Sequence, residues 1–554
     1  MEKERLSYLQ IHPKDNVLVA LRDLPQGFEV TVNGQTFLLR EGVRAKHKFT
    51  IYPLDKDADV MMYGVLVGKM NYAVTEGILI STENLRHASD NFKLGARKLG
   101  WEKPDVSGFR DRMFNGFHRS NGSVGTANYW LVIPLVFCEN RNVLTLKEAL
   151  EEKLGYQVAS KDYSNEVDEL IACYQAGASV DELLSLDLSS TKDNRERIRL
   201  FPNVDGVKFL NHEMGCGGTR MDSDALCGLL AGYITHPNVA GATVLSLGCQ
   251  HAQATILQEE IKKRDAAFDK PLFVFEQQSE GTEQELMQKA IKATFAGLTQ
   301  ANQQTRQPAP LDKLCIGLEC GGSDGFSGIS ANPALGYVSD MLVTMGGSVI
   351  LAEFPELCGV EQEMSDRCID EATAEKFMHL MKTYNAKAEA DGSGFYMNPS
   401  PGNIRDGLIT DAIKSAGAAK KGGNSPVTAV VDYPGVVTKP GLNLLCTPGN
   451  DVESTTAEVA AGANIVLFTT GLGTPTGNPI APVVKLSTNT RTFEKMPDII
   501  DLNCGTVIDG EETIAETAHR ILEYVIQVAS GEQQPKAVQL GQDDFIPWRR
   551  GVSL

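Results

Sequence analysis

From about residue 125, apolar strand-like runs alternate with segments of helical period, and this alternation constrains the fold more than any other feature. Such alternation is typical of parallel sheets covered by helices on both faces. The expected strands are 129–137, 207–211, 242–247, 272–276, 313–318, 348–354, 442–446, 465–469 and 483–486. Helices are expected at 222–235, 251–264 and 282–298, with a helix-rich insertion at 362–391. We therefore predict two doubly wound α/β regions, at residues 111–330 and 331–554.

The first 90 residues follow a different pattern, in which short strands are broken by turns. Asn33-Gly34 lies between two such strands and is a strong signal for a tight hairpin. This pattern predicts a small all-β module over residues 1–90. The polar residues that follow predict a linker at 91–110.

Length and charge narrow the classes of function. A chain of 554 residues exceeds what one hydrophobic core usually organises, so two or three domains are expected. The net charge of −19 opposes general attraction to nucleic acid or to an acidic membrane surface. No apolar run is long enough to span a bilayer, so we expect a cytoplasmic protein that binds a small molecule. The 11 cysteines are odd in number and sparse, which favours reduced thiols over disulfides.

Polar side chains follow four of the expected strands, at the point where each strand ends. In an open α/β sheet the ligand crevice lies outside the carboxyl ends of the strands, so these loops are expected to converge. Their glycines would let the backbone approach a ligand closely. The four strings are Cys138-Glu139-Asn140, His212 with Gly215-Cys216-Gly217-Gly218, Gly248-Cys249-Gln250-His251, and Glu319-Cys320-Gly321-Gly322-Ser323-Asp324.

Three cysteines in these loops, Cys216, Cys249 and Cys320, each adjoin glycine and are candidate ligands for a soft metal or an iron-sulfur cluster. The alternative is that each is a small residue in a tight turn. His212 and His251 are candidates for a ligand or a general base, because imidazole titrates near neutral pH. A capping or surface role is their alternative.

The N-terminal module offers two more candidates. His47 begins a strand and Glu83 ends the last one, so the two could form half of a metal or proton-transfer site. The alternative is an exposed histidine and a loop carboxylate. Lys414 lies in an expected helix, where a solvated face is the alternative to substrate binding.

Taken in order along the chain, several strings resemble the altronate and galactarate dehydratase family. Each string is weak alone, but together they are collinear over nearly the whole chain. They are His47-Lys48, Tyr63-Gly64 with Gly68, Gly116-Phe117-His118-Arg119, His212 with Gly215-Cys216-Gly217, His236-Pro237-Asn238, Gly248-Cys249, Cys320 to Asp324 continuing through Phe326-Ser327-Gly328 and Ala331-Asn332-Pro333, Pro399 to Asn403, Lys414-Ser415, and Phe468-Thr469-Thr470-Gly471.

This resemblance implies an antifreeze-like N-terminal module, a metal-assisted lyase that removes water from an aldonic or aldaric acid, and a homo-oligomer, most simply a dimer. It implies Fe²⁺, with Mn²⁺ or Mg²⁺ as alternatives, and does not exclude an iron-sulfur cluster. The product is a 2-keto-3-deoxy acid, because a base removes the C2 proton and hydroxide leaves C3. We expect catalytic roles for His47, Glu83, His212 and Lys414, substrate binding by Asn84, Gly217, Ser323, Asp324 and Asn403, and metal binding by His47, Glu83, Cys216, Cys249 and Cys320.

The chain also departs from the family pattern. The family's His-x-His-Asn string is replaced by Ser81-Thr82-Glu83-Asn84, and two arginines are replaced at Ser123 and Ala127. These changes keep two alternatives open. The scaffold also resembles sulfolactate sulfo-lyase, in which sulfite leaves, and a non-catalytic sugar-acid-binding paralogue would retain the fold alone. No G-x-G-x-x-G follows a strand, which disfavours a nicotinamide or flavin enzyme.

Overall fold

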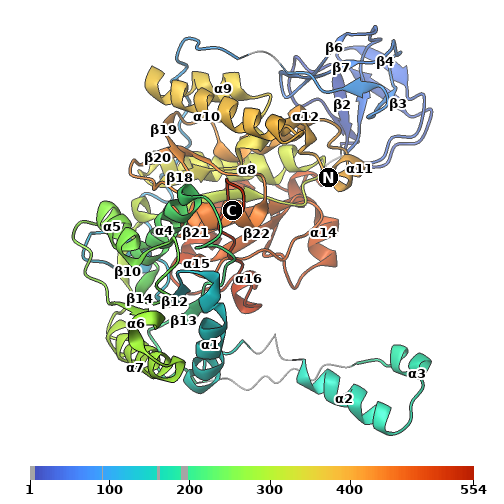
Figure 1. The fold of residues 1–554 in the computed structure, drawn as a ribbon. Helices are drawn as coiled ribbons and strands as arrows, with labels where there is room; N and C mark the ends of the chain where they lie inside the picture. The colour runs from blue at the N-terminus through green and yellow to red at the C-terminus, as the bar shows by residue number, and fades with distance from the viewer. Residues whose placement is uncertain (1–5, 90–91, 159–162, 189–197) are drawn as a thin grey trace.

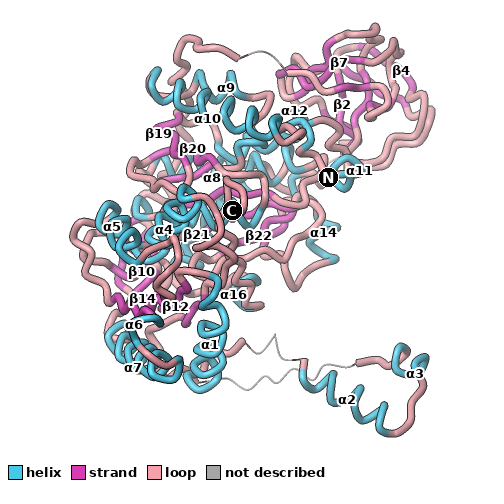
Figure 2. Tube along the Cα trace, in the orientation of Figure 1, coloured by secondary structure: helices cyan, strands magenta, loops and turns pink. Residues whose placement is uncertain are grey.

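The computed structural model describes residues 6–89, 92–158, 163–188 and 198–554. An N-terminal β module lies at one end of a layered α/β body (Figure 1). Figure 2 shows that the described part of this module consists of strands and loops. The α/β fold with a small all-β module at its N-terminus is therefore confirmed.

The module contains three small antiparallel sheets, in the orders β1-β2-β5-β8, β3-β4 and β6-β7-β9. The predicted hairpin joins β3 to β4, where Asn33 and Gly34 adopt φ values of 52° and 77°. Positive φ at both turn residues gives the twist that a two-residue hairpin needs. The strands are β1 Tyr8–Leu9, β2 Val17–Ala20, β3 Glu29–Val32, β4 Gln35–Leu38, β5 Lys48–Thr50, β6 Asp59–Met62, β7 Val65–Met70, β8 Leu79–Ile80 and β9 Leu85–Arg86.

A segment without helix or strand follows β9 in the described residues up to Arg112. It runs along the C-terminal part of the chain, since the Arg97 guanidinium donates to the Ser365 carbonyl and the Lys98 amide to the Asp366 carbonyl, each at 2.7 Å. The extended connection thus holds the module against the body.

The central sheet is parallel, in the order β13-β12-β14-β15. Its two faces pack against different helices. Trp130 and Val132 of β12 pack with α1 and α7, whereas Leu131 and Ile133 pack with α4. The elements are β12 Tyr129–Pro134, α1 Asn140–Leu154, β13 Gly206–Phe209, α4 Arg220–Thr235, β14 Val239–Ser246, α5 Ala254–Arg264, β15 Leu272–Glu276, α6 Gln277–Glu280 and α7 Glu283–Ala301.

Two helices between α1 and β13, α2 Ser164–Gln175 and α3 Val180–Leu184, bury no side chain. They project away from the rest of the molecule in Figure 1. Several large apolar side chains are exposed here: Tyr163, just before α2, and Val167, Ile171, Tyr174, Val180 and Leu184 on the two helices.

A small antiparallel sheet joins the central and C-terminal parts. Strand β10 (Met113–His118) pairs with β16 (Gln307–Pro310) and with β11 (Val124–Gly125). The sequence did not predict this sheet, because its strands are short and carry no hydrophobic alternation.

The largest sheet has seven parallel strands in the order β19-β20-β18-β17-β21-β22-β23. Its strands are apolar on both sides, as expected for a sheet covered on both faces. Along the chain, the first strand of this sheet is β17. The second α/β region therefore starts before residue 330, the end that we predicted for the first region. The strands are β17 Cys315–Cys320, β18 Ser348–Leu351, β19 Val427–Asp432, β20 Gly441–Cys446, β21 Ile465–Thr470, β22 Val483–Ser487 and β23 Leu502–Asn503.

Alternate residues of β21 show how the layers stack. Ile465 and Leu467 pack in one core with α8 and α15, whereas Val466 and Phe468 pack in another with α13 and with α4 of the central region. Helices α4 and α13 therefore lie between the two parallel sheets. The C-terminal helices are α8 Ala331–Thr344, α9 Glu361–Asp366, α10 Glu371–Ala390, α11 Pro401–Arg405, α12 Asp411–Ala418, α13 Asp451–Ala460, α14 Thr490–Lys495, α15 Ile514–Ala529 and α16 Lys536–Gln539.

In the residues that the structure describes, no helix combines the length and the apolar character needed to cross a membrane.

Candidate active site

The N-terminal module meets the seven-stranded sheet at the carboxyl ends of its strands. Strand β17 ends at Cys320 and leads into the loop that contains Asp324. The Lys46 ammonium of the module lies 2.9 Å from Asp324 Oδ2. Gly325 packs so closely on the Lys46 carbonyl that an added Cβ would lie 2.3 Å from its oxygen. This edge is where ligands bind in open α/β sheets.

Asp324 is fully buried and its carboxylate is saturated with donors. Its Oδ1 accepts from the Ser327 hydroxyl at 3.1 Å and from the Thr488 hydroxyl at 2.9 Å. Its Oδ2 accepts from the Asn489 amide at 3.2 Å, in addition to the Lys46 contact. Asp324 thus joins β17, β22 and the N-terminal module, and it fixes Lys46 in place.

His47 follows Lys46 and is half-buried at this contact. Its Nδ1 lies 3.2 Å from the Ala45 carbonyl, so Nδ1 carries the proton and Nε2 keeps the lone pair. Burial and then the neighbouring Lys48 and Arg44 lower the pKa of His47 below its usual range, despite the opposing contact with Ala45. The imidazole is therefore neutral at neutral pH, as a general base requires.

Lys48 is fully buried in β5. Its ammonium donates to the Lys46 carbonyl at 3.0 Å and to the Gly407 carbonyl at 2.6 Å, so it reaches from the module into the body. Burial lowers the pKa of Lys48 to about 7, an effect that the nearby Asp324 opposes. This lysine exchanges its proton close to neutral pH.

A second group of charges lies deeper at the same edge, and we name it the lysine cluster: Cys320, Glu353, Glu356, Lys414 and Lys421. Lys421 Nζ lies 2.8 Å from Glu353 Oε2 and 3.0 Å from Cys320 Sγ. Lys414 Nζ lies 2.6 Å from Glu356 Oε1. Burial would suppress both ammonium charges, but Glu356 raises the pKa of Lys414, and Cys320 and Glu353 raise that of Lys421.

Three more carboxyl groups adjoin the lysine cluster. Burial, followed by the nearby glutamates, raises the pKa of Glu319 well above its usual range. Burial likewise raises the pKa of Glu458. Burial, Glu353 and Glu356 together raise the pKa of Asp451 to about 7. Asp451 is only partly buried, and it lies over Gly321, where an added Cβ would be 2.0 Å from Asp451 Oδ2. Asp451 therefore holds its proton up to near neutral pH, and solvent can reach its side chain.

Ser323 and Asn403 lie together beside this loop. The Asn403 amide donates to the Ser323 carbonyl at 2.8 Å, and its oxygen completes a capping box with Ser400 at the start of α11. The Ser323 hydroxyl oxygen is buried without a hydrogen-bond partner among the described residues. The sequence-predicted residues Cys320, Ser323, Asp324, Asn403 and Lys414 therefore share one edge of the sheet with His47.

Two predicted residues at the end of the module lie elsewhere. The pairing of Lys48 with Ile80 brings Ser81, rather than Glu83, next to His47. The Glu83 side chain is exposed, and its carbonyl accepts from Asn71 at 2.9 Å. The Asn84 side chain bonds Ser81 and Leu79, so it stabilises the turn.

The predicted residues of the central region lie at the carboxyl edge of the other sheet. His212 is buried with Nε2 2.7 Å from the Pro134 carbonyl, while its Nδ1 accepts from the Met214 amide. Burial lowers the pKa of His212 to about 4. Cys249 is exposed and accepts from Gln278 at 3.3 Å, whereas the Gly217 carbonyl accepts from the Leu554 amide at 2.9 Å. Cys216 is partly buried beside Gly217.

The five residues expected to bind metal do not form one ligand set. In the described part of the chain, ligand-type side chains converge in two groups of three. Of the five predicted metal ligands, only Cys320 belongs to one of these groups. Its partners there are Glu353 and Glu356, and two ammonium groups lie within 3.0 Å of these ligand atoms. Ammonium cations at those positions repel a divalent ion, so this set does not suit the metal that the resemblance implies.

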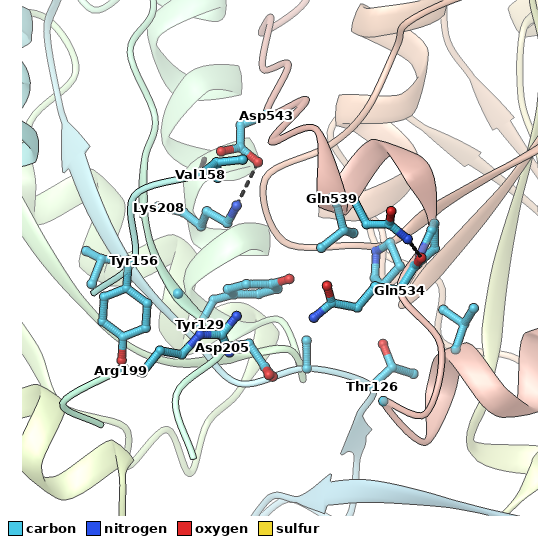
Figure 3. Close-up of a pocket in the computed structure, with 18 of the residues that line it drawn as sticks. Thr126, Tyr129, Tyr156, Val158, Arg199, Asp205, Lys208, Gln534, Gln539 and Asp543 are labelled. Carbon is cyan, nitrogen blue, oxygen red and sulfur yellow. Dashed lines mark hydrogen bonds and ion pairs between the residues drawn. The ribbon is translucent and has the colours of Figure 1, made fainter. Parts of the chain in front are cut away.

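A separate cavity of about 440 Å³ lies at the amino ends of β12 and β13 (Figure 3). Tyr129, Asp205 and Lys208 line it, and Lys208 pairs with Asp543 at 2.7 Å. Its lining includes no residue that we predicted for the site. Because it opens at the strand ends opposite to those where α/β sheets bind ligands, the edge around His47 is the better candidate.

Sequence reasoning missed several charged residues of the site. Glu353 lies inside the expected strand 348–354 but follows β18 in the structure, so a better strand boundary would have let the strand-end rule find it. No such signal marked Lys46, Lys48 or Lys421. In a sequence, a lysine that tertiary contacts bury cannot be told from a lysine on the solvated surface.

Comparison with known proteins identifies related chains. Family models match residues 6–88 (altronate/galactarate dehydratase SAF domain), 116–302 (D-galactarate dehydratase/altronate hydrolase, second domain) and 311–553 (D-galactarate/altronate dehydratase, C-terminal). An altronate dehydratase of Bacillus subtilis (strain 168) is 32% identical over 526 residues, 95% of each chain. A galactarate dehydratase (L-threo-forming) of Escherichia coli (strain K12) is 28% identical over 545 residues, 96% of this chain and 95% of its own. A (2R)-sulfolactate sulfo-lyase subunit beta of Chromohalobacter salexigens is 27% identical over 440 residues, 79% of this chain and 97% of its own.

Proposed function

Because the chain belongs to the altronate and galactarate dehydratase family, we propose that it is a hydro-lyase that converts an aldonic or aldaric acid into a 2-keto-3-deoxy acid. The observation that supports this most is the contact of Lys46, the residue before His47, with Asp324 and Gly325 at the end of β17. Elimination of water needs a base and an acid, and this loop packs against the segment that carries His47 and against Asp451.

In the first step, His47 Nε2 removes the C2 proton. That proton is weakly acidic, so the enediolate that forms needs positive charge nearby. Lys46 keeps its charge because Asp324 and then Asp406 raise its pKa against the opposing effect of burial. Lys48, buried next to His47 in sequence, adds a second ammonium group that is partly charged near neutral pH, since its pKa is about 7.

In the second step, the C3 hydroxyl leaves as water. Hydroxide is a poor leaving group, so a general acid must protonate it. Asp451 serves this step, because its raised pKa of about 7 leaves about half of it protonated at pH 7 and it lies over Gly321 of the shared loop. The enol that remains then tautomerises to the 2-keto acid.

The experiment that tests this proposal is turnover of a panel of aldonic and aldaric acids, with 2-keto-3-deoxy product measured by a colorimetric assay. Product from at least one acid, lost in His47→Gln, supports the proposal. Absence of product from every acid would contradict it. Adding a chelator to the same assay tests the divalent-metal requirement, and light scattering tests the dimer; both stay predictions from the family resemblance.

The second candidate is the sulfo-lyase reaction, and the match to a sulfolactate sulfo-lyase subunit supports it. That match covers 79% of the chain, against 95% for altronate dehydratase. Release of sulfite from sulfolactate, without turnover of any sugar acid, would favour the sulfo-lyase. A non-catalytic paralogue would bind sugar acids and turn over neither class.

A further inference from the structure

A group of ligand-type side chains outside the active site joins the end of the N-terminal module to the C-terminal sheet. We name it the His87 cluster: His87, Cys358 and Asp411. One ligand atom from each residue lies within 4.8 Å of the other two. That separation is small enough for a single ion to contact all three atoms.

Three separate elements bring the cluster together. His87 directly follows β9, Cys358 ends the 3-10 helix Phe354–Leu357, and Asp411 is the first residue of α12. The Thr410 hydroxyl, which caps α12, also donates to the Val67 carbonyl of the module at 2.9 Å. Each donor is therefore held from a different direction by backbone that is itself fixed.

Two polar atoms of the cluster are buried without hydrogen-bond partners among the described residues, although the Asp411 carboxyl also contacts the Cys358 thiol. These two atoms are His87 Nδ1 and Asp411 Oδ2. Asp411 is only 1% exposed. Leaving a buried polar atom unsatisfied costs about 1–3 kcal/mol, and more for a charged group, so such atoms need an explanation, and a bound ion is one. A bound cation would satisfy both atoms at once.

The charges around this cluster differ from those of the lysine cluster. There, Lys414 and Lys421 neutralise the carboxylates at 2.6 and 2.8 Å. The ammonium group nearest in sequence to Asp411 belongs to Lys414, and Glu356 already engages it. A further acid, Glu361, contacts the Cys358 thiol and places another carboxyl oxygen beside the cluster.

We propose that His87, Cys358 and Asp411 bind a divalent transition-metal ion that locks the segment after the N-terminal module onto the C-terminal domain. One imidazole, one thiolate and one carboxylate are borderline ligands, which suit zinc or ferrous iron better than magnesium or calcium. The ion has a structural role, and the proposal is independent of the activity proposed above.

The protonation of the ligands agrees with this assignment. Burial raises the pKa of Asp411 to about 8 and that of Glu361 to about 7, and burial with the nearby carboxylates raises that of the Cys358 thiol. Without an ion these groups hold protons. Binding a metal ion releases protons, so affinity rises with pH.

Cobalt titration of the metal-stripped full-length protein tests the proposal. Anaerobic Co²⁺ gives a thiolate-to-cobalt absorption band in the near ultraviolet when a cysteine coordinates it. We expect one equivalent per chain with this band in the wild type. Cys358→Ser is expected to abolish the band, and His87→Ala to weaken binding by at least about tenfold, since loss of even an outer-shell partner costs 10–100-fold.

Cys320→Ser and Cys249→Ser are the matched controls, and both are expected to keep the band. Far-ultraviolet circular dichroism confirms that each variant is folded, and His87→Ala, at a partly exposed position, gives a second test if Cys358→Ser fails to fold. Three results would overturn the proposal: no cobalt bound by the folded wild type, a band that survives in Cys358→Ser, or a band lost in Cys320→Ser alone.

Discussion

The Lys46 ammonium of the N-terminal module lies 2.9 Å from the carboxylate of Asp324, at the carboxyl edge of the seven-stranded sheet. The Lys46 side chain is 18% exposed and that of Asp324 is fully buried. This pair ties together two parts of the chain that lie far apart in sequence, and it positions His47 beside the loop that follows β17.

Replacing Lys46 by Met is expected to destabilise the protein by roughly 3 kcal/mol, because it leaves Asp324 as a buried charge without its cation. Asp324→Asn is expected to cost a similar amount. The double variant should lose less than the sum of the two, which urea unfolding of all four proteins measures. Additive losses would show that the pair contributes no coupling.

Replacing His47 by Gln should lower kcat by about 10²- to 10⁴-fold, because Gln cannot accept the C2 proton. The expected change in KM is small, since the amide has nearly the size of the imidazole. Steady-state kinetics on the best acid of the panel measures both constants. His379→Gln, at an exposed position on α10, is the matched control and should leave them unchanged.

The pH dependence of kcat/KM should be bell-shaped. His47 must be deprotonated, so activity falls as pH drops through its lowered pKa, below about 6.5. Asp451 must be protonated, so activity also falls as pH rises above about 7. In Asp451→Asn the rate should be lower and the alkaline limb absent. An unchanged alkaline limb in this variant would assign the acid to another group.

Lys48 should make stability rise with pH. Its folded pKa of about 7 lies below its ordinary value of 10.5, so between these values the unfolded chain holds a proton that the folded protein has released. The free energy of unfolding then increases by up to about 1.4 kcal/mol per pH unit. Below pH 7 both states are protonated and this dependence vanishes. Urea unfolding of wild type and Lys48→Met at pH 6 and pH 9 measures the difference, and equal pH slopes would contradict the prediction.

Alkylation of the native protein should distinguish exposed cysteines from buried ones. Cys138 and Cys249 are exposed, so iodoacetamide should modify them first. Cys320 is buried, and burial followed by the Glu356 charge raises the pKa of its thiol, which disfavours the reactive thiolate. Peptide mass mapping follows the order, and all 11 cysteines should react after denaturation. Early labelling of Cys320 would mean that solvent reaches the lysine cluster.

The strands and helices were predictable from sequence wherever the spacing of hydrophobic residues distinguishes a strand from a helix. The predicted strand 272–276 coincides with β15, and Asn33-Gly34 turns the predicted hairpin. The site was predictable only in part. Ser323 and Asp324 follow an apolar strand, and the rule about strand ends located them. Lys48 was not selected as a site residue, because its burial depends on Gly407, whose carbonyl approaches only in the folded chain.

The bond between Lys48 and the Gly407 carbonyl spans 359 residues of sequence. At translation rates of about 5–20 residues per second, the ribosome needs roughly 20 to 70 s to synthesise the residues between them. Throughout that interval Lys48, which is buried in the folded protein, still faces water in the nascent module. The module can form its strands early, but the surface that receives it exists only once most of the polypeptide has emerged.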